Sequence, residues 1–113
     1  RFLVDTTPDL RTQLLREDVN AVDAVIYTHA HADHMHGLDD LRGINKFIKK
    51  PLPVFADPDT HRQIAERFAY ALEPLPDDDP GYFVRPVLQM TEFCPGDEIE
   101  VSGLPVGTFF QDH

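Results

Sequence analysis

The apolar positions of this 113-residue sequence follow two kinds of pattern. Nearly continuous apolar runs predict strands, because a strand that is buried on both faces shows no alternation. These runs are 2–4, 23–28 and 54–56. Apolar residues that recur at intervals of three and four predict helices, which we expect to begin at Pro8, Gly37 and Asp57. Strands and helices therefore alternate, which predicts an α/β sheet with helices packed on it.

The spacing also predicts where each helix begins and which side chains it buries. Thr7 can cap a helix whose first position is Pro8, and Leu10, Leu14 and Leu15 are expected on its buried face. The second helix is expected over 37–49. Its buried face would consist of Leu38, Leu41, Ile44, Phe47 and Ile48.

Proline and glycine divide the rest of the chain. Asp57 and Pro58 form a capping pair for the third helix, and residues 73–81 contain three Pro and one Gly, which predicts an exposed loop. The turn-like sequence at 95–97 predicts a reversal of the chain. Three strand-like stretches lie in this part, namely 84–90, 98–101 and 106–110.

Charge narrows the classes of partner. Ten Lys and Arg stand against twenty Asp and Glu, so the formal net charge is −10. Such a chain repels duplex nucleic acid and attracts divalent cations. A single Cys forms no internal disulfide, and no apolar run approaches the ~18 residues of a membrane span. We expect no membrane partner and take the cytoplasm as the default location; the sequence predicts no particular oligomeric state.

Both ends of the sequence interrupt strand-like runs. The chain opens directly on the run at 2–4, and it stops at His113 just after the run at 106–110. We therefore expect residues 1–113 to form one partial domain, cut at both ends from a longer protein.

The most informative segment is 29–36, which follows the apolar run at 23–28. It contains four of the six histidines together with an aspartate: His29, His31, Asp33, His34 and His36. Imidazole and carboxylate are ligands of Zn²⁺, Mn²⁺ and Fe²⁺. If His29 and His31 continue a strand they point to one side, and a following turn directs Asp33 and His34 elsewhere. One segment can thus supply two pairs of ligands to two neighbouring ions.

Two simpler interpretations of this segment are weaker. An expression tag is not interrupted by an aspartate and does not follow a buried strand. A solvated loop explains one or two histidines, but it explains four with a carboxylate at a strand end poorly. A metal site is therefore the favoured interpretation, either with turnover or as a binding domain without it.

His29-x-His31-x-Asp33-His34 matches the signature motif of the metallo-β-lactamase superfamily. The stretch from Leu3 to Thr7 resembles the superfamily's earlier strand, which ends in an aspartate near the metals. His113 follows His29 by 113 − 29 = 84 residues and resembles the third histidine of the first metal. The resemblance implies an αββα sandwich, of mixed α/β (α+β) class, of which this chain holds about one half.

The resemblance also implies a role for each matching residue. His29, His31 and His113 would bind the first divalent ion, and Asp33 and His34 the second, with Asp33 counted as catalytic. The ions would be Zn or Mn, with Fe a further option. A hydroxide that bridges them would attack the substrate. The family's bridging aspartate and last histidine would lie beyond residue 113.

The sequences Thr7-Pro8-Asp9-Leu10-Arg11 and Gly37-Leu38-Asp39-Asp40-Leu41-Arg42 most resemble the phosphodiesterase branch, which includes the accessory phosphodiesterase of the carbon–phosphorus lyase pathway. This resemblance implies a small anionic substrate with a phosphodiester, of cyclic or nucleotide type. The alternatives are a thioester or lactone hydrolase of the same fold, and a metal-binding domain without turnover.

Other polar residues have two interpretations each. Asp5 could hold a ligand imidazole or serve as a turn or capping residue. His36 could face the substrate or the solvent, and Arg42 could hold a phosphate or pair with Asp39. We expect His61 to be exposed and Cys94 to be a small buried hydrophobe.

Overall fold

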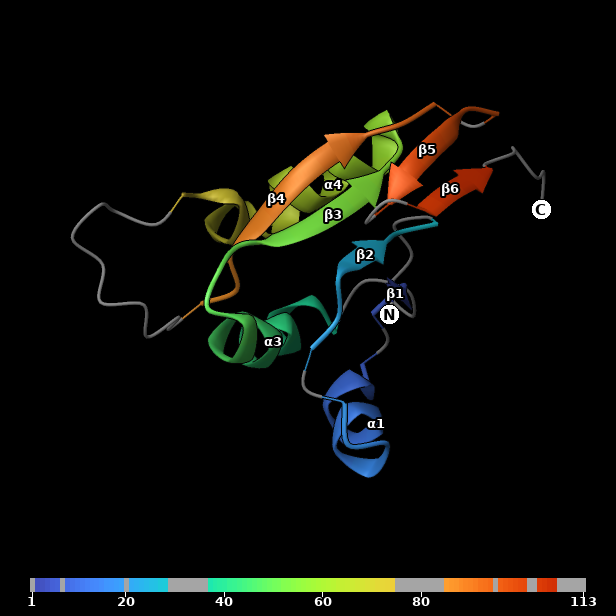
Figure 1. The fold of residues 1–113 in the computed structure, drawn as a ribbon. Coiled ribbons are helices and arrows are strands. Elements are labelled where there is room, and N and C mark those ends of the chain that lie inside the picture. The colour runs from blue at the N-terminus through green and yellow to red at the C-terminus, as the bar shows by residue number, and fades with distance from the viewer. Residues whose placement is uncertain are drawn as a thin grey trace.

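The computed structural model describes residues 2–6, 8–19, 21–28, 37–74, 85–94, 96–101 and 104–107 (Figure 1). Its elements follow in the order β1 (Phe2–Val4), α1 (Leu10–Arg16), β2 (Ala24–Ile26), η1 (Leu38–Asp40), α3 (Leu41–Ile48), β3 (Leu52–Ala56), α4 (Pro58–Arg67), η2 (Ala69–Leu72), β4 (Leu88–Glu92), β5 (Glu98–Val101) and β6 (Leu104–Gly107). Here η denotes a short 3₁₀ helix. Strands and helices alternate up to β4, which confirms the predicted α/β class.

Strands β1 to β4 form one parallel sheet in the order β1-β2-β3-β4. Each connection between them contains a helix, as parallel neighbours require. All four carboxyl ends therefore lie at the same edge of the sheet, the edge toward which the arrowheads of β3 and β4 point in Figure 1. Strands β5 and β6 form a separate antiparallel pair.

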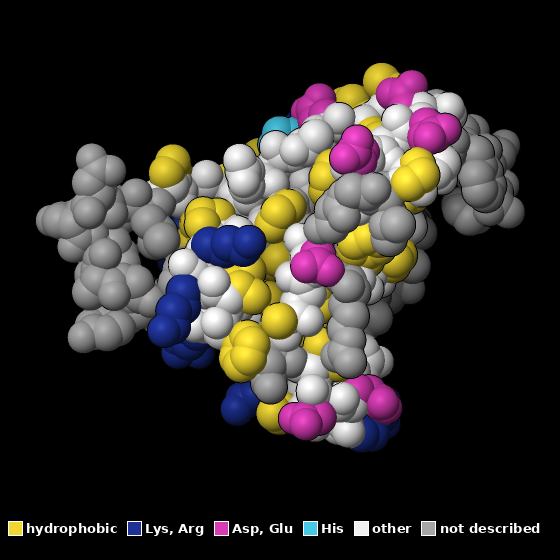
Figure 2. Space-filling view, in the orientation of Figure 1, with side chains coloured by type: hydrophobic (Ala, Val, Ile, Leu, Met, Phe, Trp, Pro, Cys, Tyr) yellow, Lys and Arg dark blue, Asp and Glu magenta, His cyan; other side chains and the backbone are white. Residues whose placement is uncertain are grey.

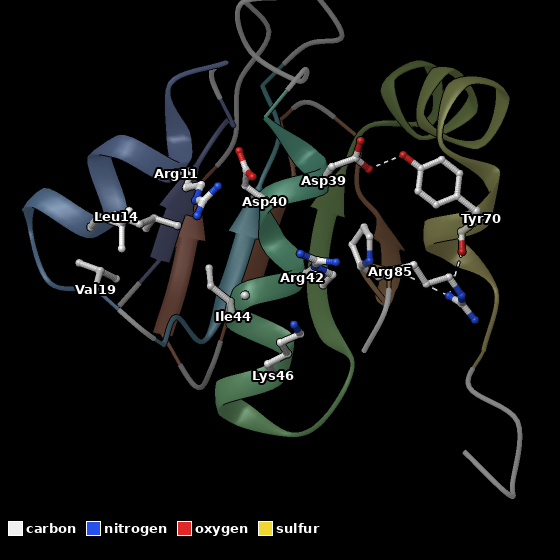
Figure 3. A pocket seen from close by; sticks show the side chains of 13 residues that line it. Arg11, Leu14, Val19, Asp39, Asp40, Arg42, Ile44, Lys46, Tyr70 and Arg85 are labelled. Atoms are coloured by element: carbon white, nitrogen blue, oxygen red, sulfur yellow. Dashed lines mark hydrogen bonds between the residues drawn. The ribbon is translucent and has the colours of Figure 1, made fainter. Parts of the chain in front are cut away.

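The core lies between this sheet and the helices. Strand β3 alternates strictly: Leu52, Val54 and Ala56 are fully buried, and the two residues between them are half-buried. The buried side belongs to one cluster with Ile44 of α3 and Ile64 of α4. One face of the sheet is thus covered by helices, which Figure 3 shows in front of the strands.

The opposite face of the sheet is apolar and less covered. Register places Val4, Ile26 and Phe55 in one row across β1, β2 and β3, on the face away from the buried side of β3. Val4 is 59% exposed, and the other two are half-buried. This row marks a second face on which a further layer can pack.

Helix α1 differs from the sequence prediction. It begins at Leu10, with Asp9 at the N-cap position and no side-chain cap, so the predicted start at Pro8 was wrong. Thr7 lies outside the described residues. Leu15 is 72% exposed, because consecutive helical residues differ by about 100° and Leu14 already occupies the face toward the core.

The segment 37–49 also differs from the single helix predicted there. Its first turn is the 3₁₀ helix η1, and α3 follows. Phe47 is 60% exposed, whereas Asn45 is fully buried. The Asn45 side-chain amide donates to the carbonyl oxygens of Lys50 (3.0 Å) and Val87 (2.9 Å), and its oxygen accepts from the Val87 N–H (2.9 Å). These bonds satisfy a polar side chain in a position where the periodicity alone favours an apolar one.

Strand β4 is displaced relative to its prediction, spanning Leu88–Glu92 rather than 84–90. Pro86 has no N–H to donate, and the Val87 N–H is bonded to the side chain of Asn45. Strand β5 covers the predicted 98–101. Residues 108–110 of the last predicted strand, and most of the predicted loop at 73–81, lie outside the described residues.

Helix α4 begins as predicted. Pro58 occupies its first turn, and a side-chain oxygen of Asp57 accepts a hydrogen bond from the Thr60 N–H at 2.8 Å. It ends at Arg67; Phe68 follows as its C-cap, and Ala69–Leu72 form η2. In the part of the chain that the structure describes, we find no helix with the length and apolarity needed to cross a membrane.

Candidate metal centre

The His-rich segment leaves the sheet at the carboxyl end of β2, next to the carboxyl end of β1. The Asp5 N–H donates to the Ile26 carbonyl at 2.9 Å, and the Tyr27 N–H donates to the Phe55 carbonyl at the same distance. The ladder of sheet hydrogen bonds therefore continues one residue past each strand. Thr28, the last described residue before the segment, lies at this edge beside Asp5.

The Asp5 carboxylate holds Thr28 through both of its oxygens. Asp5 Oδ1 accepts from the Thr28 N–H at 2.8 Å, and Asp5 Oδ2 accepts from the Thr28 hydroxyl at 2.7 Å. Asp5 has a φ of 60°, a left-handed conformation that aspartate adopts more readily than most residues. This conformation ends β1, and the side chain fixes the residue that directly precedes His29.

The other end of the segment is fixed to the same place. The Gly37 N–H donates to the Thr6 carbonyl at 2.9 Å. Thr6 is itself fully buried, and its hydroxyl is 2.7 Å from the Tyr27 hydroxyl. Burial raises the pKa of Tyr27 well above its usual value, so the phenol stays neutral. Segment 29–36 therefore starts and ends at residues bonded to Asp5 and Thr6.

The predicted ligands themselves fall outside the described residues. They are His29, His31, Asp33, His34 and His113, and His36 lies outside as well. Among the described ranges alone, no group of three or more His, Cys, Asp or Glu is placed to hold a metal ion. The donor set of 29–36 fits a divalent ion by its chemistry, and both ends of the segment are anchored at the strand edge where open α/β sheets bind ligands.

His61 is not the exposed residue that its polar neighbours suggested. Its Nδ1 lies 2.6 Å from Oε1 of Glu92, and its side chain is 29% exposed. The bond joins the first turn of α4 to the end of β4. Strand β3 separates β4 from β2, so this pair belongs to a different part of the carboxyl edge from Asp5 and Thr28.

Arg42 and Cys94 also differ from their simplest interpretations. Arg42 is exposed on α3, and within the described residues it has no ion pair. Asp39, its expected partner, instead accepts a hydrogen bond from the Tyr70 hydroxyl. Burial and this carboxylate raise the pKa of Tyr70 to about 12. Cys94 is exposed rather than buried.

The structure adds three residues that sequence reasoning did not single out as part of the site. Thr6, Tyr27 and Thr28 form the frame around Asp5. Their only sequence signal is that each is a polar-tipped residue at the end of an apolar run, which is too common a feature to indicate a role.

The chain is similar to a known protein family and to one curated protein. The family described as "Beta-lactamase superfamily domain" matches residues 1–113. The chain is 36% identical over 106 residues to a protein named octanoyltransferase from Porphyromonas gingivalis, a match that covers 94% of this chain and 20% of that protein.

Two solved structures are similar to the fold. The first is a diphosphatase of the PhnP family, with a TM-score of 0.72 and 33% identity, covering 92% of this chain and 37% of that one. The second is Zn²⁺-bound PqqB from Methylobacterium extorquens, with a TM-score of 0.55 and 19% identity, covering 88% of this chain and 31% of that one. The chain thus spans between a fifth and two fifths of the proteins it matches.

Proposed function

Because the chain belongs to the β-lactamase superfamily, we propose that it functions as a metal-dependent hydrolase that cleaves a phosphodiester or diphosphate bond in a small anionic substrate. The similarity to a diphosphatase of the PhnP family, over nearly the whole chain, is the observation that carries this proposal. It agrees with the branch implied by the residues around 7–11 and 37–42.

We assign the metal ligands to the motif. His29, His31 and His113 would hold one divalent ion and Asp33 and His34 a second, with Zn²⁺ or Mn²⁺ favoured and Fe²⁺ compatible. Bound there, the ions would acidify a water molecule and neutralise charge on the substrate's oxygens. Without them the acidic chain, with its net charge of −10, would repel a phosphate.

The described residues around the motif would orient the two ends of segment 29–36. Asp5 fixes both the N–H and the hydroxyl of Thr28, which sets the direction in which the chain enters the motif at His29. Thr6 fixes Gly37, where the chain leaves it. Asp5 is thus a positioning residue, and a further bond from it to a ligand imidazole remains a prediction.

The test is hydrolysis of bis(p-nitrophenyl) phosphate and of a nucleoside diphosphate, with metal content determined on the same sample. We expect about two ions per chain and turnover that a chelator abolishes. His31→Ala and Asp33→Ala should each lower bound metal and abolish turnover. His61→Gln is the matched control, because it removes a histidine outside the motif and should keep both metal and turnover. Unchanged turnover in His31→Ala and Asp33→Ala would refute the assignment.

A second candidate substrate is a thioester. It is favoured by the match to a protein named octanoyltransferase, although the chain covers only a fifth of that protein. The same metal-bound site could hydrolyse an acyl thioester, and an octanoyl thioester assayed in parallel separates the two. Metal-dependent hydrolysis of the thioester without hydrolysis of the phosphorus substrates would select this alternative.

A further inference from the structure

A groove of about 600 Å³ lies on the helix-covered side of the molecule, between α1 and α3 and extending to Tyr70 and Arg85. Its volume falls in the range of small-molecule sites. Leu14 and Ile44 point into the space between the two helices, and Arg11 enters the same space from α1 (Figure 3). Val19 also lines the groove, below Leu14 in this view. The exposed Leu15 extends this apolar surface outward.

The charge of the groove is opposite to that of the chain. The whole sequence has ten basic and twenty acidic residues, yet the described lining has four basic and two acidic side chains. Figure 2 shows basic side chains gathered around α3 and acidic ones around β5. Since the Debye length at physiological salt is about 8 Å, the distant carboxylates are largely screened and the local cations dominate.

Not all of these charges are engaged by the protein. Arg85 donates to the carbonyl oxygens of Tyr70, Glu73 and Pro74, so its guanidinium is engaged in fixing the backbone of residues 70–74. Asp39 accepts from Tyr70. Within the described residues, the remaining basic side chains of the groove have neither a hydrogen bond nor an ion pair. They are Arg11, Arg42 and Lys46.

Arg42 and Lys46 are four residues apart on α3, so their side chains are neighbours on one helix face. Like charges at this spacing destabilise a helix slightly, and an anion between them would remove that repulsion. Figure 3 shows Arg42 on the side of α3 toward Arg85, and Leu14 and Ile44 on the side toward α1. The lining continues from one side to the other past Gly43, which has no side chain. The site thus combines a cationic end for one charged group with an apolar surface for a short chain.

We propose that this groove binds a small amphiphilic anion, with its carboxylate or phosphate between Arg42 and Lys46 and its aliphatic chain over Leu14, Leu15 and Val19. The ligand is a single molecule in solution rather than a membrane surface. The proposal does not depend on the proposed hydrolase activity, because none of these residues belongs to the motif at 29–36.

The test is isothermal titration calorimetry on the full chain with octanoate, acetate and octan-1-ol. Octanoate should bind, and acetate and octan-1-ol should bind far more weakly, because each lacks one half of the recognised chemistry. Arg42→Gln combined with Lys46→Gln should weaken octanoate binding about tenfold, since two charge contacts are lost. Leu15→Ser should weaken it several-fold through lost apolar contact.

The matched control is Lys49→Gln combined with Lys50→Gln, which makes the same charge change at the end of α3 outside the groove. It should leave octanoate affinity within about twofold if local contacts, rather than net charge, decide binding. The proposal fails if both double variants weaken octanoate equally, if octan-1-ol binds as tightly as octanoate, or if millimolar octanoate gives no heat. It also fails if phosphatidylglycerol vesicles bind the chain while monomeric octanoate does not.

Discussion

At the scale of single residues, Asp5 makes the connection on which the candidate site depends. One carboxylate accepts two hydrogen bonds from Thr28, two residues beyond the neighbouring strand β2 and directly before the predicted metal motif. Hydrogen bonds to an ionised acceptor are about twice as strong as neutral ones. The left-handed backbone of Asp5 places the side chain there, so conformation and bonding depend on each other.

Replacing Asp5 should therefore affect both stability and metal binding. Asp5→Ala loses both bonds and leaves a β-carbon residue in a left-handed conformation that alanine adopts poorly, so we expect a loss of about 1–3 kcal/mol in the free energy of unfolding. Asp5→Asn keeps one acceptor oxygen and tolerates the conformation, and it should lose less. Urea unfolding and metal content measure the two effects.

Asp9→Ala is the matched control for this experiment. It removes the same charge four residues further along the chain, at the N-cap position of α1, where the side chain makes no capping bond. It should change the free energy of unfolding by less than about 0.5 kcal/mol, as surface substitutions usually do. Equal effects of Asp5→Ala and Asp9→Ala on stability and on bound metal would contradict the role of Asp5.

Tyr27 gives the site frame a dependence on alkaline pH. Burial raises its pKa in the folded state above the unfolded value of about 10. Above that pH the unfolded chain releases the phenol proton while the folded chain keeps it, so stability must fall as pH rises, by up to about 1.4 kcal/mol per pH unit. Below pH 10 both states are protonated, and this contribution is fully present.

Tyr27→Phe should flatten the fall in stability above pH 10 while costing about 0.5–1.5 kcal/mol at neutral pH, because the hydrogen bond to Thr6 is lost. Urea unfolding of both proteins between pH 8 and about 11 measures the difference. The pH curve of Tyr70→Phe is recorded for comparison with that of Tyr27→Phe. The pKa of Tyr70 is also raised, to about 12, but Tyr70 is much more exposed than Tyr27. Parallel pH curves for the wild type and Tyr27→Phe would show that Tyr27 is not the buried phenol described.

At the scale of elements, Asn45 joins the end of α3 to the start of β4. Its amide makes three hydrogen bonds to backbone groups of Lys50 and Val87, and its side chain is fully buried. Helix α3 follows the motif segment, and β4 is an outer strand of the sheet. This one side chain therefore fixes how the helix that follows the site sits on the sheet.

Asn45→Ala should cost about 2–4 kcal/mol of unfolding free energy, because it leaves backbone groups of Val87 without their side-chain partner and opens a small cavity. Lys46→Ala, its exposed neighbour on the same helix, is the control and should cost little. The midpoint of urea unfolding measures both. A loss below about 0.5 kcal/mol for Asn45→Ala would mean that water replaces the amide's bonds.

Part of the fold could be predicted from the sequence, and part could not. The alternation of apolar runs and helical spacing predicted an α/β sheet with helices packed on it, and Asp57 with Pro58 predicted the start of α4. Two of the errors occur beside a tertiary contact that the local pattern does not reveal, namely the bonds of Asn45. Phe47 fits the helical period but is exposed, whereas Asn45 is buried and bonded to Val87, and β4 begins after Val87, at Leu88.

At the scale of the whole molecule, the residues that flank the predicted motif, Thr28 and Gly37, lie at one edge of the sheet. The helix layer covers one face, the row of Val4, Ile26 and Phe55 lies on the other, and the carboxyl ends of β1 and β2 lie side by side between them. Four of the five proposed ligands, all except His113, are concentrated in 29–36, which is why the sequence alone suggests a metal site there. The frame of Thr6, Tyr27 and Thr28 could not be predicted, because those contacts join residues more than twenty positions apart.

The proposed ligand assignment predicts that metal binding and folding depend on each other. Ligands of a motif whose two ends are bonded to Asp5 and Thr6 converge only when β1 and β2 are paired, so metal should bind the folded state far better than the unfolded one. Linkage then predicts that metal at 100 times its dissociation constant adds about 2.7 kcal/mol to the free energy of unfolding. Removal of metal with a chelator should lower the melting temperature, and Zn²⁺ or Mn²⁺ should restore it.

Thermal unfolding of four samples decides whether this stabilisation arises at the motif. The wild type and His61→Gln should both gain stability with metal, because His61 bonds to Glu92 at a different part of the edge. His31→Ala should gain almost none, and Asp5→Ala should gain less than the wild type, since one end of the motif is then loose. A full metal-dependent shift in His31→Ala would place the stabilising ion elsewhere and separate the fold's stability from the candidate site.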